Sequence, residues 1–133
     1  MAKRVVLIGH CGPDSSYLKM AVSAAQRGTQ VIGCDEEARL QELISDGVDL
    51  LLFNRVLDFG FPEEEGVAVI HRLRAQHHNL KMMLVSNYAD AQAAAVKAGA
   101  LPGFGKKDIG SSRVAEILRS ALAGESADAR QNV

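Results

Sequence analysis

Residues able to do chemistry gather in five short segments, each directly after an apolar run. The segments are 9–14, 34–35, 54–58, 86–88 and 106–108. Cysteine, histidine and carboxylate side chains are typical of metal sites and of nucleophilic catalysis, and an exposed lysine can attract an anion. Which of these chemistries the chain supports depends on spacing and on the elements that bring the segments together.

The two cysteines do not follow a metal or disulfide pattern. Cys11 and Cys34, with His10 and Asp35 nearby, lack the short fixed spacing of zinc ligands. A Cys11–Cys34 disulfide requires the first two apolar runs to be neighbouring strands. Because a single cysteine pair is no disulfide framework, the chain is expected in a reducing compartment. We therefore expect both cysteines to be small loop or core residues.

Motifs for nucleotide binding and for catalysis are also missing. The loop Gly9-His-Cys-Gly contains neither the G-x-G-x-x-G nor the G-K-[ST] pattern. No histidine and acid arrangement supports Cys11 or Cys34 as a nucleophile. The sequence therefore does not indicate an enzyme.

The elements that must position these segments alternate between strands and helices. Apolar runs predict strands at 5–8, 29–33, 49–53, 81–85 and 101–105, with helical patterns between them and an amphipathic helix near 114–122. Asp14 or Ser15 is predicted to cap the first helix and Asp35 the second. Glu63 to Glu65 are predicted to lie in the first turn of the third helix, where the helix dipole favours negative charge.

This order predicts a flavodoxin-like α/β fold, a three-layer sandwich. Its five parallel strands would follow the order 2-1-3-4-5, with helices on both faces of the sheet. We expect residues 1–123 to form one domain and 124–133 to form a frayed polar tail. In such a fold the five polar segments meet in a crevice at the carboxyl ends of the strands.

Several stretches resemble the receiver domain of two-component response regulators, in the CheY-like superfamily. Residues 49–58 resemble the third strand and its loop, and residues 66–74 the glycine-led third helix. Residues 85–90, 97–100 and 103–109 resemble the region from the fourth strand through the fifth. The resemblance covers roughly 3–122 of the chain, and it rests on the order and spacing of these stretches.

The resemblance assigns a role to each position of the crevice. A typical receiver binds Mg²⁺ with an acidic pair after the first strand and a carboxylate ending the third, which accepts a phosphoryl group from a histidine kinase. A hydroxyl after the fourth strand and a lysine after the fifth read the phosphate. By this resemblance the acceptor position is Asn54, the acidic pair is Gly9 and His10, the hydroxyl is Ser86, the lysine is Lys107 and the aromatic switch position is Phe104.

These departures predict a vestigial phosphorylation site. The asparagine amide lacks the charge of a carboxylate nucleophile, and the lost carboxylates were the oxygen ligands that Mg²⁺ prefers. We therefore expect no cofactor and weak or absent Mg²⁺ binding. Asp14, Asp35 and Asp58 are the remaining carboxylates near the crevice, and we interpret the first two as helix caps and Asp58 as a turn residue. Lys107 is expected to turn toward Asn54 or Asp58.

The leading hypothesis is a phosphorylation-independent signalling module that works by protein contact with an effector or a kinase. The resemblance implies a contact or homodimer face on the fourth helix, fifth strand and fifth helix, including Ala91, Ala95, Lys106, Arg113 and Arg119. The alternative is a small-molecule or anion-binding domain whose crevice is lined by His10, Cys11, Asn54, Ser86 and Lys107.

Composition excludes other classes of partner. The chain carries 15 basic and 16 acidic side chains, and its two halves, 1–62 and 63–133, differ by only a few charges. Without a basic block, nucleic acid is not an expected partner. No apolar run approaches the about 18–20 residues of a membrane span, so we expect a soluble, cytoplasmic protein.

Overall fold

The computed structural model describes residues 2–123, and the predicted tail at 124–133 lies outside them. Five strands alternate with five α-helices, and a short 3-10 helix, η1, precedes the last one. The strands are β1 (Arg4–Ile8), β2 (Gln30–Cys34), β3 (Leu50–Asn54), β4 (Met82–Val85) and β5 (Leu101–Phe104). The helices are α1 (Gly12–Ala25), α2 (Glu37–Asp46), α3 (Gly66–Gln76), α4 (Ala89–Ala98), η1 (Lys106–Asp108) and α5 (Ser112–Leu122).

The strands form one parallel sheet in the order β2-β1-β3-β4-β5, which confirms the predicted fold class and topology. The middle strand β3 is apolar from Leu50 to Phe53, and these side chains are completely buried. Such a run suits a strand that is covered on both faces. Because all five strands point the same way, their last residues meet at one edge of the sheet, called the carboxyl edge below.

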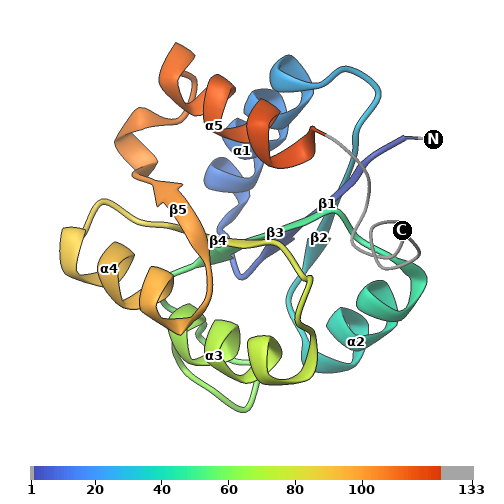
Figure 1. The fold of residues 1–133 in the computed structure, drawn as a ribbon, viewed down its shortest axis with the longest axis vertical. Coiled ribbons are helices and arrows are strands. Elements are labelled where there is room, and N and C mark those ends of the chain that lie inside the picture. Colours follow the sequence, from blue (N-terminus) through green and yellow to red (C-terminus); the bar gives the residue numbers. More distant parts are fainter. Residues whose placement is uncertain (1, 124–133) are drawn as a thin grey trace.

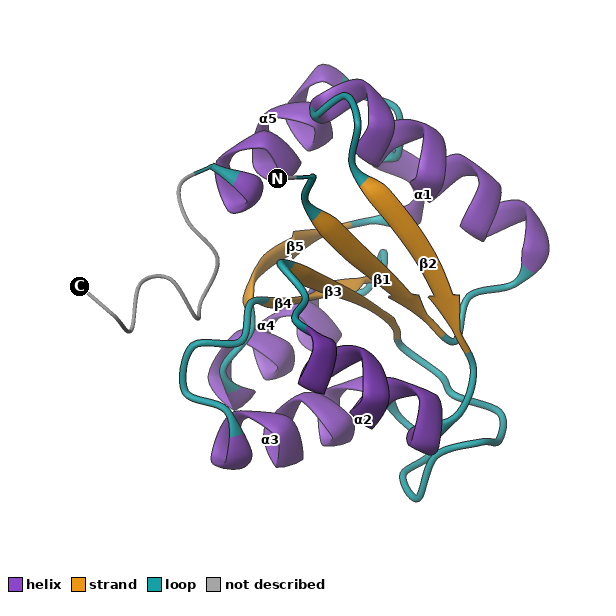
Figure 2. Cartoon of the chain, turned by 90° about the vertical axis from the view of Figure 1, so that its right-hand side faces the viewer, coloured by secondary structure: helices purple, strands orange, loops and turns teal. Residues whose placement is uncertain are grey.

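Helices cover both faces of the sheet, as Figures 1 and 2 show. One face packs against α1 and α5 and the other against α2, α3 and α4, so the molecule has two apolar cores separated by the sheet. The cores fix the helices, and the helices in turn fix the loops of the carboxyl edge. Within residues 2–123, no helix combines the length and the apolar character needed to cross a bilayer.

The predicted helix starts need correction. Helix α1 begins at Gly12 with Cys11 as its N-cap residue, so Asp14 and Ser15 lie inside the first turn and neither caps it. Pro13, in the first turn, favours this earlier start because its fixed φ is already helical.

The second and third helices differ from the prediction for a tertiary reason. Asp35 does not cap α2, because the N-cap position falls on Glu36 and the Glu37 N–H donates to the distant Gly60 carbonyl at 2.8 Å. Helix α3 begins only at Gly66, so Glu63 lies in the preceding loop rather than in the first turn. Carbonyl and side-chain partners from elsewhere in the fold therefore replaced the local caps.

Candidate functional site at the carboxyl edge

Asn54, the last residue of β3, ties the two central strands together at the carboxyl edge. Its Nδ2 donates to the carbonyl oxygen of Gly9 at 3.1 Å and to that of Val56 at 3.0 Å. Both amide hydrogens are then in use. Its Oδ1 is buried and accepts no hydrogen bond from the described residues. The side chain therefore holds the backbone together and offers no anionic oxygen.

Leu57 fills the space above Gly9. Leu57 is only 2 % exposed, and a Cβ added to Gly9 would collide with its Cδ2 atom. Gly9 also has a φ of 75°, in the left-handed region that glycine adopts without strain. An apolar side chain therefore occupies the part of the edge between β1 and the loop after β3.

His10 lies largely buried beside these residues. Its Nε2 lies 2.9 Å from the carbonyl oxygen of Leu52 and donates to it, while Nδ1 is buried without a hydrogen-bond partner in the described part of the chain. Burial lowers the pKa of His10 below its ordinary value, and the charge of Lys106 acts in the same direction. The bond to Leu52 and the carboxylates of Asp14 and Asp35 oppose this shift. The net result favours a neutral imidazole.

The lysine that enters the edge is Lys106 rather than Lys107. The Lys106 Nζ lies 3.1 Å from Asp14 Oδ2 and pairs α1 with η1. Partial burial acts to raise the pKa of Asp14, but hydrogen bonds from Lys106 and Cys11 outweigh it, so this pKa lies below its usual value. The Lys107 side chain is exposed, and only its backbone N–H contacts the edge, donating to Asn87 Oδ1 at 3.0 Å. Two adjacent lysines left this choice open in the sequence.

Ser86 and Phe104 close the far side of the edge. Ser86 is 4 % exposed, and its Oγ accepts from the backbone N–H of Tyr88 at 3.2 Å, just before α4. Its own N–H donates to the Phe104 carbonyl at 2.9 Å. Gln92 of α4 adds Nε2 contacts to the carbonyls of Leu84, Ser86 and Phe104. The Phe104 ring is buried in the core with α1 and α5. The hydroxyl and the aromatic ring are therefore held in place.

Comparisons with known proteins find solved structures that share this architecture. No family model and no curated protein matches the sequence. Among solved structures, NtrX from Brucella abortus superposes with a TM-score of 0.76 at 17 % identity, over 99 % of this chain and 29 % of that protein. A response regulator from Thermotoga maritima gives 0.73 at 21 % identity, over 93 % of this chain and all (100 %) of that one. The beryllofluoride-activated NtrC4 receiver domain dimer gives 0.65 at 16 % identity, over 90 % and 95 %.

The chain has the receiver fold. At these identities the similarity concerns the fold, and the chain spans less than a third of NtrX. Within the receiver fold, Asn54, Ser86 and Phe104 stand at the carboxyl edge, as expected from the sequence resemblance. Lys107 is at the edge only through its backbone.

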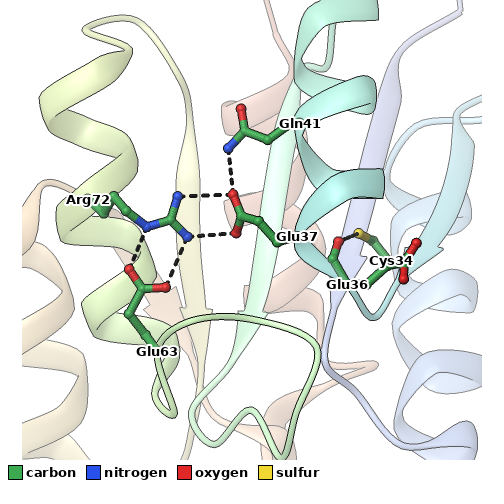
Figure 3. Close-up of polar contacts among 6 residues, drawn as sticks. All are labelled: Cys34, Glu36, Glu37, Gln41, Glu63 and Arg72. Carbon is green, nitrogen blue, oxygen red and sulfur yellow. Dashed lines mark hydrogen bonds and ion pairs between the residues drawn. The ribbon is translucent and has the colours of Figure 1, made fainter.

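The two cysteines and the carboxylates of Asp35 and Asp58 do not form a cluster at the carboxyl edge. Cys11 is exposed and Cys34 is buried, and both are free thiols, as expected for a loop and a core residue. The Cys34 Sγ donates to the Glu36 carbonyl at 3.4 Å (Figure 3), and burial raises the pKa of this thiol. Asp35 and Asp58 are exposed in loops.

The receiver fold implies a Mg²⁺ site at this edge, and the residues present do not fit one. The positions hold Gly9, His10 and Asn54, none of which supplies a carboxylate. The Asn54 amide nitrogen already donates hydrogen bonds to the carbonyl oxygens of Gly9 and Val56. In the described chain no group of three or more His, Cys, Asp or Glu side chains could hold a metal. No step of the function proposed below needs a metal.

The face formed by α4, β5 and α5 also differs from the expectation in two places. Arg113 and Arg119 are exposed, as predicted, but Ala95 is completely buried against the core. Lys106 turns away from this face because it pairs with Asp14. A mostly apolar groove of about 670 Å³ lies on the face, between β5 and the outer side of α5.

Proposed function

We propose that this chain is a receiver-like signalling module of the two-component type that acts without phosphorylation, by contact with a protein partner. The observation that carries the proposal is the double hydrogen bond of the Asn54 amide to Gly9 and Val56. A neutral amide has no anionic oxygen to attack a phosphodonor, and these two hydrogen bonds hold the side chain in place as a structural link. Leu57 above Gly9 further limits access to this position.

The rest of the carboxyl edge supports a module in one fixed state. Ser86, Gln92 and Phe104 are joined by hydrogen bonds that span β4, α4 and β5. A switch needs two states of similar free energy and a ligand that prefers one of them. Here no residue accepts the phosphoryl group that would favour one state. Either a protein partner favours one of the two states, or the domain stays in a single conformation.

The contact surface we propose is the face formed by α4, β5 and α5. It carries exposed Arg113, Glu116, Arg119 and Ser120 together with the apolar groove. Apolar patches on a polar surface are typical of protein contact sites. One similar structure, the NtrC4 receiver domain, is described as a dimer, which makes a homodimer one candidate assembly alongside an effector or a kinase.

The alternative of a small-molecule or anion site at the carboxyl edge has less support. Lys106 is neutralised by Asp14, Lys107 extends into solvent, and Ser86 Oγ is engaged by the backbone of Tyr88. The polar groups on the Lys106 and Ser86 side of the edge are thus satisfied within the fold, whereas Asn54 Oδ1 and His10 Nδ1 are buried without a partner among the described residues.

A phosphodonor experiment tests the first half of the proposal. The protein is incubated with acetyl phosphate and Mg²⁺, and intact mass spectrometry is expected to find no added phosphoryl group. A phosphorylatable receiver domain treated in parallel is the positive control. A stoichiometric adduct mapped to Asp14 or Asp58 would mean that a neighbouring carboxylate has replaced the missing acceptor.

A set of four variants tests the second half. Arg113→Glu and Arg119→Glu are expected to reduce capture of the partner from the native host, because charges at the rim of an interface set association rate and specificity. Ser86→Ala and Lys107→Ala are expected to leave capture unchanged. A melting curve for each variant separates lost binding from lost folding. The opposite ranking would favour the carboxyl edge as a ligand site.

A further inference from the structure

Acidic and basic side chains are unevenly distributed along the chain. The net charges of residues 1–62 and 63–133 do not reveal this, because they are similar. Residues 31–66 carry 10 acidic and 2 basic side chains, whereas residues 67–123 carry 3 acidic and 8 basic ones. The acidic part includes α2, β3 and the loop after β3, and the basic part includes α4, β5 and α5. The segment around the loop after β3 is therefore strongly acidic, whereas residues 89–122, from α4 to α5, carry 5 basic and 3 acidic side chains.

The loop between β3 and α3 and the surface of α5 lie on different sides of the molecule. In Figure 1 the green loop between β3 and α3 lies at the bottom and α5 lies at the top, and the two are again well separated in Figure 2. The loop and the α5 surface of the same copy are thus far apart, so contact between them requires two copies.

The loop between β3 and α3 is held in a defined conformation. The backbone N–H of Leu57 donates to the Glu64 carbonyl at 2.8 Å, and Val56 pairs with Glu65 as in an antiparallel ladder. Gly60 has a φ of 96° and packs so tightly on the Asp35 carbonyl that a Cβ would collide with it. The loop is therefore docked onto the start of α2.

Arg72 of α3 fastens the same loop to α2, as Figure 3 shows. Its guanidinium donates to both carboxylate oxygens of Glu63 in the loop, at 2.5 and 3.0 Å, and to both oxygens of Glu37, at 3.1 and 2.7 Å. Gln41 donates to Glu37 at 2.7 Å and completes the cluster. Paired forks of this kind fix geometry as well as charge.

This fixed loop leaves one large apolar side chain in solvent. Phe59 is 85 % exposed, while Phe61 two residues later packs against the core. Exposed acidic side chains surround it on the loop and at the start of α2, namely Asp35, Glu36, Asp58, Glu64 and Glu65. A pre-ordered aromatic side chain is the usual anchor of an interface, because little entropy is lost when it binds.

The groove on the basic side has the matching properties. Its floor is apolar, formed by Met83, Leu101, Pro102, Ile117 and Ala121, and its volume of about 670 Å³ leaves ample room for a phenyl ring. Arg113 on its rim is 67 % exposed and lies 3.9 Å from Asp108, and Glu116 is paired with Arg119 at 2.7 Å. The groove therefore offers an apolar seat with one largely exposed guanidinium group, that of Arg113, at its rim.

We propose that Phe59 of one copy of this chain inserts into the groove between β5 and α5 of a second copy. The acidic side chains around Phe59 then face Arg113 and the other cations of the basic part. Because the two surfaces lie on different sides of one copy, a single contact leaves a free loop on one copy and a free groove on the other, so association is head-to-tail and continues beyond two copies. It builds on the proposed function by naming an occupant for the α4, β5 and α5 face.

Self-association of the purified chain tests this contact, and the probe is the protein itself. Sedimentation velocity over a concentration series in low salt is expected to show species that grow beyond a dimer. Added salt should reverse this growth, because it screens the charges. Phe59→Ala is expected to weaken association at least about tenfold, the usual effect of losing an anchor residue. Tyr17→Ala, at an aromatic residue of α1 that is 60 % exposed, is the matched control and should associate normally.

A complementation experiment then identifies the two surfaces. Ser120→Glu places bulk and negative charge at the groove on an exposed helix position, while leaving Phe59 intact. Phe59→Ala and Ser120→Glu, each alone, should associate at least about tenfold more weakly than the wild type. Mixed, they should form a 1:1 complex that stops at two copies, since only one productive contact remains.

Three outcomes would overturn the inference. They are a monomer at every concentration, a Phe59→Ala variant that associates like the wild type, and a mixture of the two variants that stays monomeric. A closed dimer unaffected by Phe59→Ala would indicate a symmetric contact instead. None of these outcomes affects the proposed function, because partner capture through Arg113 and the phosphodonor test are measured separately.

Discussion

The Nδ2 atom of Asn54 lies 3.1 Å from the carbonyl oxygen of Gly9, a residue 45 positions away in the chain. The same nitrogen also donates to the carbonyl oxygen of Val56 at 3.0 Å, so one side-chain amide links the loops that follow β1 and β3. Carbonyl oxygens are also ligands of hard cations. The amide hydrogens of Asn54 therefore engage two oxygen atoms of a kind that could otherwise bind a cation.

Replacing Asn54 by aspartate tests this relationship. In Asn54→Asp a carboxylate oxygen would face the carbonyls of Gly9 and Val56 with no hydrogen to share. We expect a loss of about 1–3 kcal/mol in the free energy of unfolding, the usual cost of an unsatisfied buried group. Urea unfolding measures it. The matched control is Asn87→Asp, at an exposed position whose Oδ1 already accepts a hydrogen bond, and it should change stability little.

The same variant is expected to remain a poor phosphoacceptor. His10 and Gly9 still supply no carboxylate, so acetyl phosphate should give little phosphorylated Asn54→Asp by intact mass spectrometry. Efficient, Mg²⁺-dependent phosphorylation would show that the single change at the end of β3 restores the whole site.

Mg²⁺ binding to the wild-type protein should be weak or absent. The matched positions offer no carboxylate, and the nearby Asp14 is occupied by Lys106 at 3.1 Å. Calorimetric or NMR titration is expected to detect no Mg²⁺ binding with a dissociation constant below about 1 mM, because a strong site needs several oxygen ligands. A tighter site that disappears in Asp14→Ala would mean that the first loop has rebuilt the acidic pair.

Arg72→Lys should loosen the loop that carries Phe59. Lysine cannot donate in two parallel forks, so it cannot hold Glu37 and Glu63 together. We expect a loss of about 1–2 kcal/mol in unfolding free energy, since charged hydrogen bonds that are partly exposed are worth this much. Hydrogen exchange at 56–65 should rise in parallel. Arg119→Lys, at an exposed i,i+3 pair with Glu116, is the control and should be near neutral.

Stability should fall on the acid side of neutrality through His10. Burial, the largest cause, lowers the pKa of His10 in the folded state, so the unfolded chain binds the proton more readily. The imidazole therefore costs nothing above the unfolded value near 6.5 and destabilises the fold as pH decreases below it. Lys106 strengthens this effect, and Asp14 and Asp35 weaken it.

Thermal melts between pH 7.5 and 5 (roughly one unit on each side of the ordinary histidine pKa) measure this dependence. His10→Gln keeps a donor for the Leu52 carbonyl but cannot titrate, so its acid-side loss should be smaller than that of the wild type. His71→Gln, at an exposed position of α3, is the matched control and should retain the loss. Equal slopes for all three proteins would exclude His10 as the cause.

The sequence alone determined the sheet and its order. Apolar runs such as 50–53, alternating with helical patterns, leave few topologies open once crossovers are right-handed. The expectation that Asn54, Ser86 and Phe104 meet at one edge follows from the same rule. The pattern of apolar residues is sufficient to predict the strands because it indicates which segments are buried, and buried apolar segments form the centre of the sheet.

Tertiary structure alone decided what the polar side chains do. Whether Lys106 or Lys107 enters the edge depends on the turn of η1, and whether Glu63 caps a helix or binds Arg72 depends on a loop docked against α2. Leu57 above Gly9 and the Gly60 carbonyl on α2 are further contacts of this kind. Each hydrogen bond has several possible local partners of similar energy, and only the packing of distant segments selects among them.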